Sequence, residues 1–457
     1  MSSLQTTPQD LRRLLQRASE LAADYWESLP QRPSYPATSG TKLKQLFEVD
    51  LPESGLGAAA FDDFPSIADH IRPGNGRFFG YVLGSGEPVA AIADLLASAL
   101  NQNLTAWRSA PAAVTIERTV VSWLATAIGC EGFTGSLTGG GSSANLMGLA
   151  MAREAKLPAN DQGTQGGTVY ASEEAHMSIS KGVALLGLGR ANLRLVPVDS
   201  QFRMRTDTLA EMIQQDKKAG KRPIAVVATA GTVNTGAIDP LAGIAEIAKL
   251  ENLWFHVDGA YGALAAIAQP ERFRGLALAD SLSLDPHKWL YQPLDCGCLL
   301  FRDAAAARRA FCDAGDYARV ASTDPVEGFA FFDESIELSR RFRALKLWIS
   351  LRYHGLAAFR SAIQRDLDHA QMLAEKVRAN PMLELMAPVG LSVVCFRVRG
   401  KDNAKVLPRI VQRGRVYISN ATIRGEFALR ACFVNHRTTP ADVQLIVDEA
   451  LAAAAEL

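Results

Sequence analysis

Short β-branched runs alternate with amphipathic stretches between residues 167 and 301, and this alternation constrains the fold more than any other feature of the chain. Helical stretches such as TDTLAEMIQQDKKAG and DPLAGIAEIAKLENL separate several of the runs. Strands that alternate with helices predict a mostly parallel sheet covered on both faces. In such a sheet ligands bind at the carboxyl ends of strands, so residues that end or follow a run are candidate site residues. The predicted strands are GTVYAS, LRLVPV, PIAVVATA, LWFHVD, DSLSLD and GCLLF.

The pattern changes on either side of this region. Residues 1–87 start with a helical stretch and continue into the Pro-rich segment SLPQRPSYPATSG, which is typical of an arm or linker. Residues 341–457 hold two long helical stretches, then the candidate strands LSVVCFRVRG, RVYISNA and EFALRACFV, and a last helix. We therefore expect an N-terminal helical arm (1–87), a large α/β domain (88–340) and a small C-terminal α+β domain (341–457).

Composition and charge narrow the functional class. Lys and Arg number 48 and so do Asp and Glu, so no overall field predicts nucleic acid or an anionic membrane as a partner. The first residues contain no apolar signal segment, and the longest apolar run, PVAAIADLLASAL, is short and carries Asp94. Six cysteines in 457 residues do not form a disulfide framework. We expect a soluble cytoplasmic enzyme that acts on a small molecule.

Two polar residues stand where buried strands are predicted to end. Asp258 ends NLWFHVD, and Lys288 follows DSLSLD. Alone, the aspartate could be a sheet-end cap and the lysine could extend to water. Together they suggest a pyridoxal phosphate site, in which a lysine forms the Schiff base and an acidic residue keeps the pyridine nitrogen protonated.

The stretch GSLTGGGSSANLMGLAMAREA places Gly139, Gly140 and Gly141 directly before a predicted helix. Backbone N–H groups at a helix N-terminus bind phosphate, although a plain glycine-rich loop before a capped helix has the same pattern. The stretch also matches G-x-G-x-x-A, a weak dinucleotide fingerprint. That fingerprint expects an acidic residue about 20 positions on, whereas Glu173 and Glu174 come later. A nicotinamide-dependent oxidoreductase is therefore the weaker alternative.

His176, in VYASEEAHMSISKG, lies just beyond a predicted strand and opens a helical stretch. It could be a capping or packing residue. In a pyridoxal site, its flat imidazole could stack on the cofactor ring and hydrogen-bond the substrate carboxylate. Cys296 and Cys298 have no second ligand pair at a zinc spacing, so we interpret them as core cysteines and expect no metal.

With these residues in place, the sequence resembles the group II pyridoxal phosphate-dependent decarboxylases of the aromatic-L-amino-acid decarboxylase type. The resemblance runs from GRFFGYVLGS to LRACFVNHRTT, and DPHKWLYQPLDCG, HVDGAYG and ATAGTVNTGAID carry it in combination. It implies a type I, aspartate aminotransferase-like fold and a homodimer with the active site near the subunit interface. It also implies decarboxylation of an L-amino acid to the amine and carbon dioxide, a reaction of amino acid metabolism. A rival with the same cofactor is oxidative deamination to an aldehyde.

The resemblance also implies residue roles. Lys288 matches the Schiff-base lysine, Asp258 the pyridinium partner, His176 the stacking histidine, and Tyr317, in DAGDYARV, the tyrosine that returns a proton to the α-carbon. The other implied positions are Gly141, Ser142, Thr232 and His287 around the cofactor, and Tyr81, Val82 and Trp107 near the substrate.

The chain departs from the family pattern at four positions. Val233 replaces a frequent threonine, and Asp285 replaces an asparagine often found before PHK, which places an anion near the phosphate. Val82 and Leu83 stand where aromatic-specific members carry an aromatic residue and a proline. These two replacements reshape the pocket, so the sequence does not name the side chain that is bound.

Overall fold

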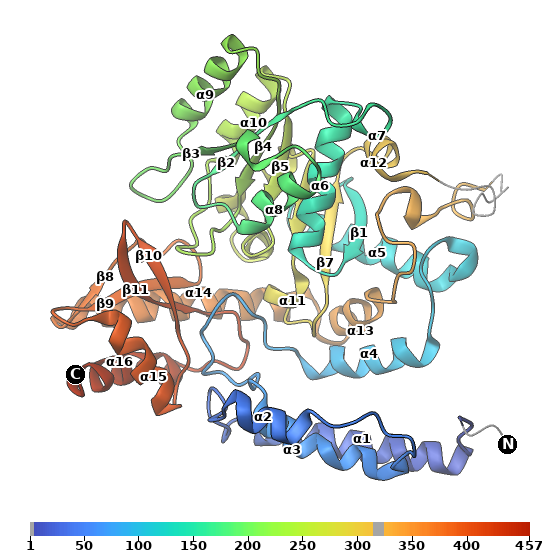
Figure 1. Ribbon diagram of the computed structural model, residues 1–457, viewed down its shortest axis with the longest axis vertical. Coiled ribbons are helices and arrows are strands. Elements are labelled where there is room, and N and C mark those ends of the chain that lie inside the picture. Colours follow the sequence, from blue (N-terminus) through green and yellow to red (C-terminus); the bar gives the residue numbers. More distant parts are fainter. Residues whose placement is uncertain (1–3, 314–323) are drawn as a thin grey trace.

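The computed structural model describes residues 4–313 and 324–457, and its largest element is a seven-stranded sheet in the order β1-β7-β6-β5-β4-β2-β3 (Figure 1). The strands from β2 to β6 pair in parallel, whereas β7 is antiparallel to both β6 and β1. The predicted mostly parallel sheet is therefore confirmed, and all six predicted strands are present. The bounds are β1 (Thr134–Thr138), β2 (Thr168–Ser172), β3 (Leu193–Val196), β4 (Pro223–Thr229), β5 (Trp254–Asp258), β6 (Ser281–Leu284) and β7 (Gly297–Phe301).

The sequence did not predict β1, whose residues TGSLT lack the β-branched run of the other strands. Its five residues pair with β7, so a neighbouring strand rather than local propensity specifies it.

Helices cover both faces of this sheet. Side chains alternate along β4, so Val226 and Ala228 join one core cluster while Ala225 and Val227 join another on the opposite face. Helix α6 crosses the second face and contacts β4 to β7, and α5, α9 and α10 cover the first. The helices that precede or cover the sheet are α4 (Pro88–Leu100), α5 (Pro111–Ala127), α6 (Gly141–Lys156), α7 (Ala159–Gln162), α8 (Met177–Leu185), α9 (Thr206–Lys218), α10 (Leu241–Leu250), α11 (Pro286–Trp289), α12 (Ala304–Phe311) and α13 (Ala344–His354).

The C-terminal part forms a four-stranded antiparallel sheet in the order β10-β11-β9-β8, packed against helices. Of its strands, the short β8 was not predicted, and β10 begins at Ser419, four residues after the predicted start at Arg415. The bounds are α14 (Leu356–Ala379), β8 (Leu383–Leu385), β9 (Val393–Val398), α15 (Asn403–Arg413), β10 (Ser419–Ile423), β11 (Glu426–Cys432) and α16 (Pro440–Ala455). Thr439 caps α16 with its side chain, as predicted.

Helix α14 joins the two cores. Its residues from Phe359 to Leu367 belong to the core cluster of the large sheet, and those from Ala370 to Val377 to the cluster of the small sheet. Helix α13 packs on α4 and α5, so the segment after residue 341 contributes to both cores. The division at residues 87 and 340 stays a prediction.

The N-terminal helices α1 (Pro8–Ser28), α2 (Gly40–Phe47) and α3 (Phe64–His70) form a separate layer beside α4 (Figure 1). Leu11 and Leu15 on α1 are 51% and 46% exposed, although they belong to the apolar stripe that predicted this helix. In the part of the chain that the structure describes, no helix has the length and apolar character needed to cross a membrane.

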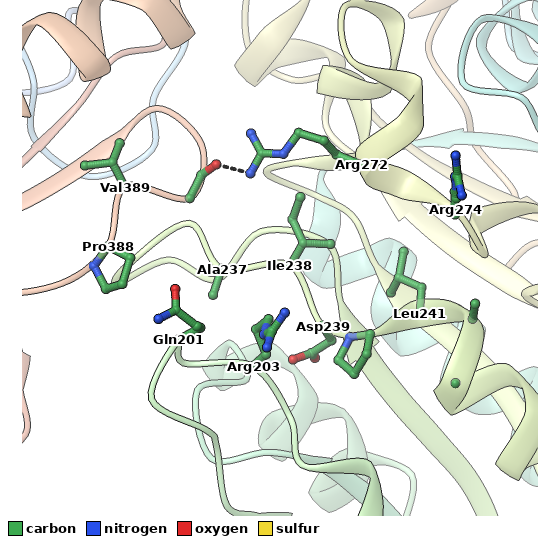
Figure 2. A pocket seen from close by; sticks show the side chains of 14 residues that line it. Gln201, Arg203, Ala237, Ile238, Asp239, Leu241, Arg272, Arg274, Pro388 and Val389 are labelled. Carbon is green, nitrogen blue, oxygen red and sulfur yellow. Dashed lines mark hydrogen bonds between the residues drawn. The ribbon is translucent and has the colours of Figure 1, made fainter.

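A cleft of about 480 Å³ lies where the loop after β4 meets the small domain (Figure 2). Arg272 donates to the carbonyl of Gly390 across this cleft, and Arg203 is paired with Asp199 at 2.7 Å. A hydrogen bond from a side chain to a backbone carbonyl therefore spans this cleft. The candidate catalytic residues lie in a different cavity.

Candidate active site

A cavity of about 770 Å³ lies beyond the carboxyl ends of β4, β5 and β6, where the topology predicts ligands to bind. Of the residues predicted from the sequence, those that line it are Tyr81, Val82, Gly141, Ser142, His176, Asp258, His287 and Lys288. Its volume is within the range of roughly 300–1,000 Å³ that is usual for small-molecule sites. The structure thus brings together residues that are up to about 200 positions apart in the chain.

Lys288 lies on the one-turn helix α11, so it follows the end of β6 rather than lying in a strand. Its Nζ is 2.9 Å from Asp285 Oδ2, and its side chain is 20% exposed. The next residue, Trp289, is fully buried and donates from Nε1 to Asp366 at 3.0 Å. A buried indole therefore anchors the helical turn that carries the amine.

Asp258 is the last residue of β5 and is 5% exposed. Its Oδ1 accepts hydrogen bonds from Ser283 Oγ at 3.1 Å and from the Ala260 N–H at 3.2 Å. Its Oδ2 makes no hydrogen bond within the described residues, and the residue lines the cavity. One carboxylate oxygen is thus fixed while the other is free for a ligand.

The glycine loop forms a cradle of bare backbone. Gly140 has a φ of 146°, and α6 begins at Gly141 without a side-chain cap. A Cβ at Gly141 would lie 2.5 Å from Ala260 Cβ and 2.9 Å from Asp285 Oδ2, so only glycine fits there. In the described structure the N–H groups of Gly141 and Ser142 have no backbone acceptor, which suits an anion at the positive end of the helix dipole.

Two histidines in the cavity are neutral. His176 caps α8, and burial lowers its pKa even though Asp258 and Asp285 raise it. Burial likewise lowers the pKa of His287. The Nδ1 of His287 accepts from the Cys296 N–H at 3.2 Å, and its Nε2 is 3.6 Å from Asp285 Oδ2. Each ring keeps one nitrogen tied to the protein.

Three predicted site residues are not in the cavity as the structure describes it. Thr232 is fully buried, and its hydroxyl bonds to Thr235 Oγ1 at 2.9 Å and accepts from the Ala237 N–H at 3.1 Å. The backbone N–H of Trp107 donates to the backbone carbonyl of Phe329 at 2.9 Å, and Trp107 is not among the residues that line the cavity. Tyr317 lies outside the described residues. The roles of all three stay predictions.

The structure adds residues that the sequence reasoning missed, above all Arg430. It is 2% exposed and lines the cavity, and it donates to the carbonyl oxygens of Tyr81 and Val233 at 2.9 Å each. No carboxylate lies within 4 Å of its guanidinium among residues 4–313 and 324–457. An arginine within the otherwise apolar run FALRAC, after Glu426 at the start of the strand, was the signal that could have identified it.

The cavity residues fit pyridoxal 5'-phosphate. Asp285 Oδ1 and Thr229 Oγ1 are buried and have no partner within the described chain, and the residues of both line the cavity. An amine, a carboxylate with one free oxygen, a neutral imidazole and a phosphate cradle are the groups that this cofactor requires. In a two-domain α/β fold of this topology, they define a pyridoxal phosphate enzyme.

Comparison with known proteins identifies the family. Residues 41–399 match the pyridoxal-dependent decarboxylase conserved domain, and the chain belongs to this family. It is 34% identical to an aromatic-L-amino-acid decarboxylase of Bacillus atrophaeus, over 100% of this chain and 98% of the relative. It is 30% identical to a phenylacetaldehyde synthase of Petunia hybrida, over 93% of this chain and 90% of the relative.

Solved structures share the whole fold. Tryptophan decarboxylase of Catharanthus roseus in complex with L-tryptophan is 27% identical and superposes with a TM-score of 0.90, over 99% of each chain. The type I fold and the cofactor predicted from the sequence are thereby confirmed, and a nicotinamide enzyme is excluded. The protein is a pyridoxal phosphate-dependent carboxy-lyase that converts an L-amino acid to its amine and carbon dioxide.

Proposed function

We propose that the substrate is an L-amino acid with a large apolar side chain, of the aromatic class. The observation that carries this proposal is the set of large apolar side chains in the lining of the cavity. These side chains are Tyr81, Val82, Leu83, Met177 and Leu294. The described lining holds one unpaired cation, Arg430, which suits the single α-carboxylate of such a substrate rather than a second acidic group. The aliphatic Val82 and Leu83 favour a broad apolar slot.

Each polar residue has a task in this proposal. When bound, the cofactor supplies an electron sink for the bond that breaks to the leaving carboxylate. Lys288 would hold the cofactor through its Nζ, which lies in the cavity lining. Asp258, with Oδ1 fixed by Ser283, would use its carboxylate to stabilise a protonated ring nitrogen. The N–H groups of Gly141 and Ser142 bind the phosphate.

The last step is the return of a proton to the α-carbon, which we assign to Tyr317 from the family resemblance. This step separates amine formation from the aldehyde chemistry named in the Petunia relative. Amine is the expected product, because the tyrosine that supplies the proton is present in this chain.

We also propose that the enzyme is a cytoplasmic homodimer. Helix α4, which lies beside the N-terminal layer (Figure 1), exposes Ile92, Leu95 and Leu96 by 52%, 52% and 49%. Apolar surfaces of this kind mark subunit interfaces. Within the described residues, Cys130, Cys296, Cys298, Cys395 and Cys432 form no disulfide, which supports a reducing compartment. Light scattering on the purified protein tests the dimer, in which Trp107 is expected to lie near the active site of the partner subunit.

The test of the function is a panel of L-amino acids assayed for carbon dioxide, amine and aldehyde together. We expect amine and carbon dioxide in equal amounts from phenylalanine, tyrosine or tryptophan, and no turnover of glutamate. Borohydride reduction should leave the cofactor attached to the peptide that contains Lys288. Lys288→Ala should lose this attachment and all turnover, whereas Lys181→Ala, an exposed lysine near the cavity, should retain both. Full activity of Lys288→Ala would overturn the assignment.

A further inference from the structure

A continuous chain of hydrogen bonds runs from His176 in the cavity, through Asn145 of α6, to Trp254 at the start of β5. His176 Nδ1 contacts Ser178 Oγ at 2.8 Å, and Asn145 Nδ2 donates to Ser178 Oγ at 3.0 Å. Asn145 Oδ1 lies 2.9 Å from His256 Nε2. His256 Nδ1 lies 2.8 Å from Ser281 Oγ, which accepts from Trp254 Nε1 at 2.8 Å.

The two ends of this chain fix its direction, because each end is a group that can only donate. The Ser178 backbone N–H donates to His176 Nδ1 at 3.2 Å, so Nδ1 is an acceptor and carries no proton. The Ser178 hydroxyl must then also donate to Nδ1, which leaves Ser178 Oγ to accept from the Asn145 amide. At the other end the Trp254 N–H donates to Ser281 Oγ.

The interior bonds follow from these ends. Since the Asn145 amide nitrogen donates to Ser178 Oγ, the amide oxygen of Asn145 accepts a hydrogen bond from the N–H at His256 Nε2. His256 Nδ1 then accepts a hydrogen bond from the Ser281 hydroxyl. This direction agrees with the bond that Trp254 donates to Ser281 Oγ. A flipped Asn145 amide would require a proton on His176 Nδ1, where the Ser178 N–H already points.

We propose that Ser178 and Asn145 are positioning residues that hold His176 as a neutral ring protonated on Nε2, so that it offers the cavity one fixed N–H donor. His176 lines the cavity, and its Nε2 makes no hydrogen bond with any residue that the structure describes. A neutral N–H donor suits a carboxylate oxygen, which it binds without taking up a proton. This inference rests on the proposed function only for the identity of that acceptor.

The packing keeps the chain of bonds from rearranging. Ser178 and Asn145 are 4% and 1% exposed, and His256 is fully buried. A Cβ at Gly148 would lie 2.5 Å from His256 Cε1, so the imidazole is pressed against the backbone of α6 and cannot turn. Burial also lowers the pKa of His256 to about 4, so the neutral form holds through the physiological range.

Charges around His176 come from three other segments as well as its own helix. Asp258 on β5 and Asp285 beyond β6 favour the protonated ring, while Lys288 on α11 and Lys181 on α8 oppose it. Burial, the largest influence, lowers the pKa of His176. The hydroxyl and the backbone N–H of Ser178 also lower the pKa of His176, because both donate to Nδ1 only when Nδ1 carries no proton.

The test measures the titration midpoint of each of the seven histidines by exchange of the ring C–H hydrogen, read by mass spectrometry on peptides. The cofactor-free protein and the holoenzyme are both used. Ser178→Ala removes the hydroxyl donor and should raise the His176 midpoint by about half to one pH unit, since a hydrogen bond contributes about 0.5–1.5 kcal/mol and one unit is 1.36. Ser180→Ala, on the same helix and without a role in the chain of bonds, should not move it.

Three further variants sharpen the result. Ser178→Thr retains the hydroxyl and should keep the wild-type midpoint, whereas Ser178→Cys, a weak donor of similar volume, should raise it and replaces the alanine variant if that one does not fold. Asn145→Asp draws the Ser178 hydroxyl to a carboxylate and should raise the midpoint too.

Equal His176 midpoints in Ser178→Ala and Ser180→Ala would overturn the proposal. Kinetics give an independent check: in Ser178→Ala, KM for the amino acid should rise, and its pH dependence should shift with the midpoint. The exchange measurement needs no substrate. An enzyme that fails the amino acid panel but shows the expected midpoints would therefore refute the proposed substrate and support the positioning role.

Discussion

Asp366, on α14, should make the enzyme less stable as the pH rises from about 4 to about 7. Its carboxylate is 1% exposed, and Oδ2 accepts from Trp289 Nε1 at 3.0 Å and from the Tyr291 hydroxyl at 2.8 Å. Burial raises the pKa of Asp366 from the ordinary 3.8 to about 7, although these two hydrogen bonds lower it. The unfolded chain releases this proton near pH 4, whereas the folded protein keeps it until about pH 7. Stability is therefore lost from pH 4 to pH 7, by about 1.4 kcal/mol per pH unit.

The variant that isolates this effect is Asp366→Asn, whose amide oxygen can accept the same two donors but does not titrate. Between pH 5 and 7, its free energy of unfolding should gain about 2–3 kcal/mol relative to the wild type. Urea midpoints of the two proteins at half-unit steps of pH measure the difference, with the exposed Asp368→Asn on the same helix as control. Parallel curves for the wild type and Asp366→Asn would show that the folded protein holds Asp366 ionised. The hydrogen bonds from Trp289 and Tyr291 to residue 366 lie beside Lys288. Because asparagine keeps both bonds, the variant should bind cofactor as the wild type does.

Three other perturbations test the remaining assignments. Asp258→Asn should retain cofactor but lose about 100-fold or more in turnover, because a neutral partner no longer stabilises a charged ring nitrogen, and a loss under about threefold would make Asp258 a structural cap. Tyr317→Phe should still release carbon dioxide while amine gives way to aldehyde, ammonia and peroxide under air; unchanged amine yield would exclude this hydroxyl as the acid. Glu117→Gln should cost about 3–5 kcal/mol in urea unfolding, because it leaves the buried Arg340 guanidinium, 2.5 Å from Glu117, without its full partner. An unchanged midpoint would show that solvent reaches Arg340.

The middle of the fold could be predicted because hydrophobic pattern and strand order agree there. Each of the six strands from β2 to β7 has its own β-branched or apolar run, and helices between parallel strands leave few topologies open. The missed strands β1 and β8 lack such a run, and pairing with β7 and β9 specifies them. Tertiary contact rather than local propensity decides such segments.

The candidate site was predictable only to the extent that its residues stand at strand ends. Asp258, Lys288, His176 and the glycine loop share this position in the sequence, and the topology brings them to one cavity. Arg430 lies within a strand of the other domain, so strand-end reasoning could not associate it with them. Thr232 stands next to the cavity loop, but its hydroxyl bonds to Thr235, so its predicted place beside the cofactor stays a prediction.

Asp285 shows what the sequence cannot supply. A carboxylate beside a phosphate cradle is unfavourable in isolation, and the sequence identifies this replacement without indicating what compensates it. In the structure Asp285 Oδ2 is 2.9 Å from Lys288 Nζ and 3.6 Å from His287 Nε2. It also lies 2.9 Å from where a Cβ of Gly141 would be, directly against the positive end of α6. The compensation thus comes from a cation one helical turn along the chain and from a helix dipole about 140 positions away. Because the second contribution exists only after β6 and α6 have packed together, no local pattern could have revealed that an aspartate is tolerated at this position.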